Sequence, residues 1–67
     1  MKQTVENIAA IHLALAETAM RRAAEALCAV GSDEANLHAK ELRGAMKMVR
    51  NWELELRKLH RKAQNDE

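Results

Sequence analysis

The residues best suited to chemistry are seven cations spaced along one stripe of the second half of the chain. Between residues 40 and 62 the sequence holds eight basic and three acidic residues. On a helix, seven of these basic residues recur on one broad face, with a single leucine in their middle. We expect this stripe to bind a partner, and its members are Lys40, Arg43, Lys47, Arg50, Leu54, Arg57, Lys58 and Arg61.

Three interpretations of the stripe compete. A row of cations can follow a phosphate backbone, although no aromatic side chain interleaves these cations to stack on bases. Leu54, an apolar side chain surrounded by cations, instead resembles the centre of a protein-binding hot spot. The third interpretation is a solvated face with local ion pairs, of Glu53 with Arg57 and of Glu55 with Lys58.

Other chemistry is weakly indicated. Glu34, His38 and Glu41 share a helix face, and Glu25 lies level with His38 across a hairpin, which is similar to carboxylate–histidine metal sites in helical bundles. The order His38-x-x-Glu41 reverses the motif of those sites, so we expect no metal and no cofactor. Cys28 has no basic residue one helical turn away to activate its thiol.

The sequence also lacks a Ser–His–Asp set, a Cys–His set and a glycine-rich phosphate loop. We therefore expect a protein that is not an enzyme and has no small-molecule substrate.

The elements that carry these residues are two long helical patterns, separated by the single turn signal Val30-Gly31-Ser32-Asp33. Gly31 suits the left-handed end of a helix, while Ser32 and Thr4 suit the starts of the two helices. The sequence predicts an all-α, two-helix antiparallel hairpin that forms one domain over residues 1–67. We expect a helix over about 5–30, a turn at 31–32, a helix over about 33–62 and a frayed tail over 63–67.

Apolar spacing suggests how the helices pack. Leu13, Met20 and Leu27 recur every seven residues, and the small residues expected to alternate with them are Ala9, Ala16, Ala23 and Val30. We expect Trp52 to pack in the core. Gly44 has two interpretations, a close approach of the two backbones or an ordinary exposed glycine.

The apolar arc of the first helix is wider than one partner helix needs. Its surplus residues are Ile8, His12, Leu15, Ala19 and Ala26. A chain of 67 residues with one cysteine can form no intrachain disulfide and only a small core. We therefore expect a homodimer in which two hairpins form an antiparallel four-helix bundle.

The longest apolar run, residues 8–16, is too short to span a bilayer, so we expect no membrane association. The default compartment is the cytoplasm of a bacterium or of a cell infected by a phage. The favoured function is a small regulator, adaptor or inhibitor that binds a protein partner stoichiometrically through the second helix. The alternative is a dimer that binds RNA or DNA through the cationic stripe, although the net charge is only +1.

Overall fold

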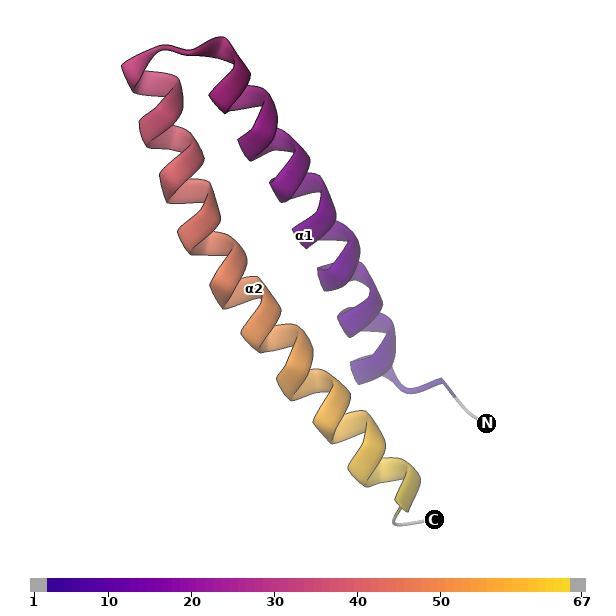
Figure 1. Ribbon diagram of the computed structural model, residues 1–67. Helices are drawn as coiled ribbons and strands as arrows, with labels where there is room; N and C mark the ends of the chain where they lie inside the picture. The colour runs from indigo at the N-terminus through magenta and orange to yellow at the C-terminus, as the bar shows by residue number, and fades with distance from the viewer. Residues whose placement is uncertain (1–2, 66–67) are drawn as a thin grey trace.

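The protein is a two-helix hairpin in the computed structural model, which describes residues 3–65. Helix α1 covers Val5–Val30 and helix α2 covers Asp33–Asn65. The helices run antiparallel, so the start of α1 and the end of α2 lie at the same end of the rod (Figure 1). No strand occurs within residues 3–65, and the predicted all-α hairpin is confirmed.

The turn has the chemistry that the sequence predicts. Gly31 has φ 78°, a left-handed conformation in which a residue with a Cβ is strained. Ser32 Oγ accepts a hydrogen bond from the Ala35 N–H at 3.1 Å, which caps the start of α2. Asp33 and Glu34 then place negative charge in the first turn of α2, where the helix dipole is positive. The chain reverses direction here because one helix ends and the next begins at once.

The open end of the hairpin is held by Thr4. Its Oγ1 accepts a hydrogen bond from the Asn7 N–H at 3.1 Å and caps α1, as predicted. The same oxygen forms a hydrogen bond with His60 Nδ1 at 2.8 Å. The cap of α1 therefore also connects the two helices at the end opposite the turn.

The helices pack along a narrow seam, whose residues recur at alternating intervals of three and four. Within the described chain the buried residues are four alanines, Ala10, Ala24, Ala35 and Ala39. The half-buried seam residues are Leu13, Glu17, Met20 and Leu27 of α1 with Leu42, Met46, Val49, Glu53, Leu56 and His60 of α2. Small side chains let the two backbones approach each other. As a result, no large side chain among these residues is fully enclosed.

The seam of α1 is rotated by one residue from the predicted pattern. Its small or polar members are Ala10, Glu17 and Ala24, and the residues predicted at this place were Ala9, Ala16, Ala23 and Val30. Of the predicted set, Ala16, Ala23 and Val30 are exposed. Alanine fits both the predicted stripe and the observed one. The observed stripe also contains Glu17, and a charged residue is not expected in a seam. The pattern alone therefore favours the wrong rotation.

Trp52 does not lie in the core of a single hairpin, and its burial in a four-helix bundle stays a prediction. The residue is 49% exposed. Glu53 occupies the seam, and its neighbour Trp52 is turned about 100° away around the helix axis. The indole therefore borders the seam and remains accessible to another molecule.

Helix α2 is longer than predicted. It continues through residues 63–65, because Ala63 and Gln64 favour helix and Gln64 is half-buried. Residues 66–67 of the predicted frayed tail lie outside the described residues. Neither described helix is long and apolar enough to cross a membrane.

Gly44 is an ordinary exposed glycine. A Cβ built at this position would have no neighbour within 4 Å, and the residue is exposed. Of the two interpretations of Gly44, the close approach of the backbones is therefore wrong.

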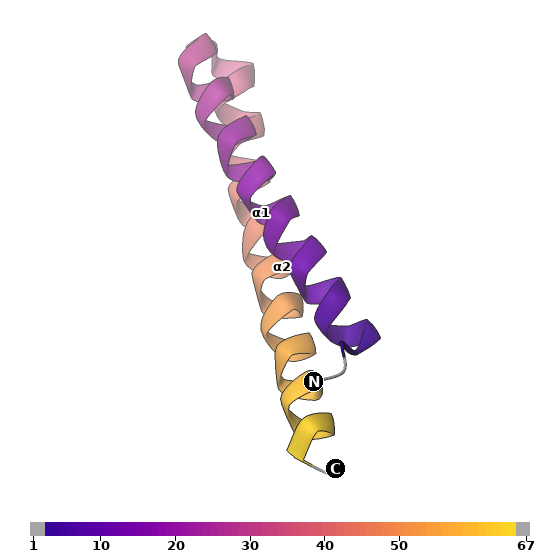
Figure 2. The ribbon, with the colours of Figure 1, turned by 90° about the vertical axis from the view of Figure 1, so that its right-hand side faces the viewer.

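One hairpin is a thin rod with almost no interior. Its Cα atoms extend over 53 × 16 × 11 Å. The radius of gyration is 15.5 Å, whereas a compact domain of this length would have about 11 Å. In Figure 2, α1 overlaps α2 near the turn, and the two helices separate toward the chain termini, so they form a single layer. The layer leaves both of its flat sides open.

Candidate interaction surfaces

One flat side of the layer carries a shallow groove between α1 and α2. It consists of two adjoining depressions of about 340 and 170 Å³, which share Glu17, Arg21 and Arg50. We call it the basic groove, and its lining residues are Ala14, Glu17, Thr18, Arg21, Arg43, Met46, Lys47, Arg50, Glu53 and Leu54. Both helices contribute to it, whereas the sequence predicted a surface on α2 alone.

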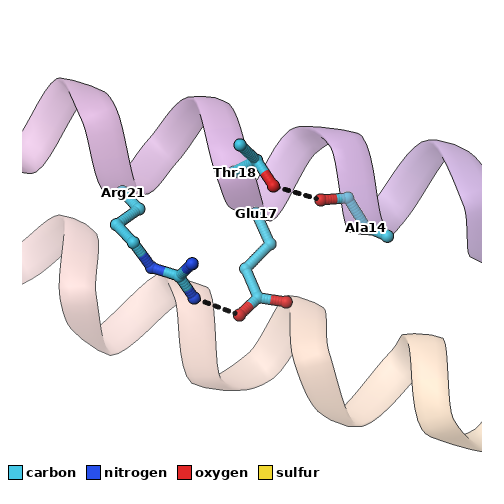
Figure 3. A network of polar contacts seen from close by, with 4 residues as sticks. All are labelled: Ala14, Glu17, Thr18 and Arg21. Atoms are coloured by element: carbon cyan, nitrogen blue, oxygen red, sulfur yellow. Dashed lines mark hydrogen bonds and ion pairs between the residues drawn. The ribbon is translucent and has the colours of Figure 1, made fainter.

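The carboxylates in the groove are held by arginines one turn further along their own helices. Arg21 Nη2 donates to Glu17 Oε1 at 3.1 Å, and Arg57 Nε donates to Glu53 Oε2 at 2.8 Å. Only 13% of the Glu17 side chain and 15% of the Glu53 side chain are exposed. Figure 3 shows Glu17 and Arg21 extending from α1 toward α2. The negative charge in the groove is therefore already paired.

Three cations in the groove have no carboxylate partner within residues 3–65. Arg43 Nη2 donates to Cys28 Sγ at 3.5 Å, across the hairpin. Sequence spacing missed this basic neighbour of Cys28 because Arg43 approaches from the other helix. Lys47 and Arg50 form no hydrogen bond or ion pair with any described residue. Their charges are available to an acidic group from outside.

Leu54 gives one end of the groove an apolar patch. The residue is 49% exposed and lines the larger depression together with Ala14. The Thr18 hydroxyl beside them donates to the Ala14 carbonyl oxygen at 3.2 Å, so this polar group is already satisfied (Figure 3). The result is a small apolar patch bordered by the charged side chains Arg21 and Arg50.

The structure divides the predicted stripe into two groups. The residues that line the basic groove are Arg43, Lys47, Arg50 and Leu54. Those outside it are the exposed Lys40, Lys58 and Arg61 and the half-buried Arg57. The predicted ion pair of Glu53 with Arg57 is confirmed, whereas Glu55 and Lys58 form no ion pair in the part of the chain that the structure describes.

Sequence reasoning missed the contribution of α1 to the groove. Ala14, Thr18 and Arg21 lie on one side of the seam, at intervals of three and four residues. The alternating spacing of Leu13, Glu17 and Met20 marks the seam and so would have placed these three residues beside it. That prediction requires a glutamate to be accepted as a seam residue.

Most of the large exposed apolar side chains lie outside the groove, on the opposite flat side and on the outer edges of the two helices. Trp52 is two residues from both Arg50 and Leu54, which turns it about 160° from each around α2. We call this region the apolar face, and its large exposed residues are Val5, Ile8, Leu15, Val30, Leu37, Met48, Trp52 and Leu59. Their exposed fractions range from 45% for Ile8 to 79% for Val5. A single hairpin therefore leaves a long apolar surface in contact with water.

The predicted surplus arc of α1 belongs to this region. Its residues Ile8, His12, Leu15, Ala19 and Ala26 are all exposed. The hairpin itself does not cover them, and their coverage by a second copy stays a prediction.

The histidine and acidic residues considered for metal binding are dispersed. His38 Nδ1 lies 3.4 Å from Glu41 Oε1, with 64% and 65% of the two side chains exposed. Among residues 3–65, no three His, Cys, Asp or Glu side chains form a group that could hold a metal ion.

The chain matches no protein-family model, no curated protein and no solved structure. Its function must therefore be inferred from the geometry of its two flat sides.

Proposed function

We propose that this chain is a non-catalytic binding protein. It pairs with a second copy through the apolar face and binds a protein partner, as a regulator, adaptor or inhibitor, through the basic groove. The observation that carries the proposal is the opposition of the two sides. Large exposed apolar side chains, Trp52 among them, lie away from a cationic groove that has an apolar patch at one end.

Pairing follows from the lack of an interior. Complete burial of a large apolar side chain contributes about 1.5–3 kcal/mol, so covering the exposed half of the eight large residues contributes on the order of 6–12 kcal/mol per chain. Two chains together would offset an association cost of about 4–15 kcal/mol. A second copy presents the same long apolar surface, and two such layers stacked face to face form a four-helix bundle.

The choice of a protein partner rests on Leu54. A leucine 49% exposed, with Arg50 and Arg21 around it, suits an apolar anchor from a protein and contributes nothing to a phosphate contact.

Nucleic acid is the second candidate because of one specific observation. Lys47 and Arg50, with Lys40 and Arg61 beyond the groove, form an exposed row of cations on α2 with no carboxylate partner among the described residues. A binder of this kind would lose affinity steeply with salt, with a log–log slope of about −0.9 for each phosphate neutralised on duplex DNA.

The exposed thiol of Cys28, which is not in a disulfide, suits a reducing compartment. The proposal therefore keeps the cytoplasm as the place of action.

The test compares Leu54→Ala with Leu37→Ala as baits for partner capture, with and without nuclease treatment. Leu37 is the matched control because it is also a leucine of α2, is 56% exposed and does not line the groove. We expect Leu54→Ala to lose captured protein that Leu37→Ala retains, and nuclease to have no effect. Equal capture by both variants would remove the reason for a protein partner at the groove, and loss of capture after nuclease would favour the second candidate.

A further inference from the structure

The chemistry of the groove also indicates what kind of protein segment it binds. Resting on the proposed function, we propose that the occupant of the basic groove is an acidic amphipathic α-helix of a partner protein. It lies along α1 and α2 as a third helix, with its apolar stripe over Ala14 and Leu54. Its carboxylates face the cations of α2.

The backbone of the hairpin favours a helical partner. Both sides of the groove are helices whose N–H and C=O groups bond within the helix, so the groove offers no free backbone partner to an extended peptide. A segment that loses water on entering the groove must satisfy its own backbone. An α-helix does this with its internal hydrogen bonds.

The length of the groove suits a short helical contact. Arg43 and Leu54 mark its ends on α2, and the 1.5 Å rise per residue separates them by about 16 Å along the helix axis. A partner helix covers this distance in about three turns. The small side chain of Ala14 on the opposite wall allows the partner backbone to approach closely.

The charges specify where the acidic residues of the partner lie. Lys47 and Arg50 are three residues apart on α2 and have no partner within the described chain, so they match two acidic residues one turn apart. Glu17 and Glu53 lie in the groove with their charges already paired within their own helices, so a partner carboxylate beside them gains no free cation. The partner helix therefore carries apolar or small residues at its centre and Asp or Glu along the edge that faces α2.

The test is a selection of peptides from a displayed random library of about 16 residues, long enough for three to four helical turns. The target is the full folded protein, with the Arg50→Glu protein as the counter-selection. We expect the enriched peptides to share apolar residues spaced by three and four, with acidic residues on one flank. A synthetic peptide of an enriched sequence should become helical by circular dichroism when it binds.

Variants then locate the bound peptide. Leu54→Ala and Arg50→Glu should each weaken binding by about tenfold or more. The matched controls Leu37→Ala and Lys58→Glu alter exposed residues outside the groove and should change the affinity less than about twofold. Exchanging one acidic residue of the peptide for lysine should restore binding to the Arg50→Glu protein.

Three results would overturn the inference. The first is no enrichment, the second is enriched peptides without helical spacing or acidic residues, and the third is binding that Leu54→Ala leaves unchanged. A parallel titration with RNA and DNA duplexes covers the other class of partner. Duplex binding that is steeply salt-dependent and insensitive to Leu54→Ala would replace the helix with nucleic acid. If the selection fails while protein capture still depends on Leu54, the helical occupant is wrong and the proposed function stands.

Discussion

The two flat sides of this hairpin differ in how far their side chains already have favourable surroundings in a single chain. In the basic groove, the carboxylates of Glu17 and Glu53 are paired within their helices, and the cations that remain free are well solvated. On the apolar face, eight large side chains are 45–79% exposed, and their contact with water is unfavourable. A charged side can stand free and bind transiently, whereas an apolar side needs a lasting cover. This difference is why we propose a permanent partner for the apolar face and an exchangeable partner for the basic groove.

Trp52→Ala should produce the largest effect if a second copy covers the apolar face. We expect a loss of about 3–5 kcal/mol in the free energy of unfolding of the dimer, since the indole would then be fully buried. Chemical denaturation at several protein concentrations would measure this loss. Leu54→Ala, a comparable exposed residue on the other side, should change the same quantity by less than about 0.5 kcal/mol. A water-exposed indole, with a stability independent of protein concentration, would contradict the pairing.

The seam that separates the two sides should respond to added volume. Ala39 is completely buried between the helices, so Ala39→Leu should destabilise the hairpin by about 1–3 kcal/mol through overpacking. In a chain of this size each kcal/mol lowers the melting temperature by about 4–8 °C. The control Ala29→Leu adds the same volume at an exposed position of α1 and should leave the melting temperature nearly unchanged. Equal effects of the two substitutions would show that the seam is elsewhere.

The path of the chain could be predicted because its signals are local. Thr4, Gly31 and Ser32 each act on the backbone within a few residues of themselves, so the caps and the turn follow from residue type alone. The exposure of Lys47, Arg50 and Leu54 was predictable for the same reason, since the periodicity of one helix is enough to place them.

The rotation of α1 about its own axis could not be predicted, because two neighbouring stripes of alanines fit the seam about equally well. Ala10 and Ala24 are buried while Ala16 and Ala23 are exposed, and nothing in an alanine distinguishes the two roles. Glu17 makes the observed stripe harder to recognise, because a charged residue is not expected in a seam, although here its side chain is largely buried while its carboxylate reaches Arg21. The groove depends on that rotation, which is why its α1 half was missed.

Substitutions of the two glycines should change the free energy of unfolding by smaller amounts and in opposite directions. The substitution at Gly44 also tests whether the outer edge of α2 is free. Gly44→Ala should raise the free energy of unfolding by about 0.5–1 kcal/mol, since the added Cβ meets nothing and alanine favours helix. Gly31→Ala should lower it by about 1–2 kcal/mol because its φ of 78° is strained for alanine. Thermal unfolding would measure both. If Gly44→Ala instead weakens pairing or partner binding, a third surface is in use and the two-sided description is incomplete.

The smallest expected effect on stability separates the two sides most cleanly. Glu53→Gln removes the ion pair with Arg57, which as an i,i+4 pair should cost about 0.3–0.5 kcal/mol. The same change makes the groove more basic without touching the apolar face. Sedimentation should therefore show an unchanged dimer dissociation constant.

Partner binding should change in a direction that depends on the partner. An acidic helix or a phosphate backbone gains from the lost negative charge, whereas a partner that presents a cation to Glu53 loses its acceptor. Glu55→Gln provides the control, because it removes the same charge from an exposed carboxylate outside the groove that pairs with no described residue. If Glu53→Gln altered dimerisation as much as it altered partner binding, the two sides would be one continuous interface, and the division of roles between them would be wrong.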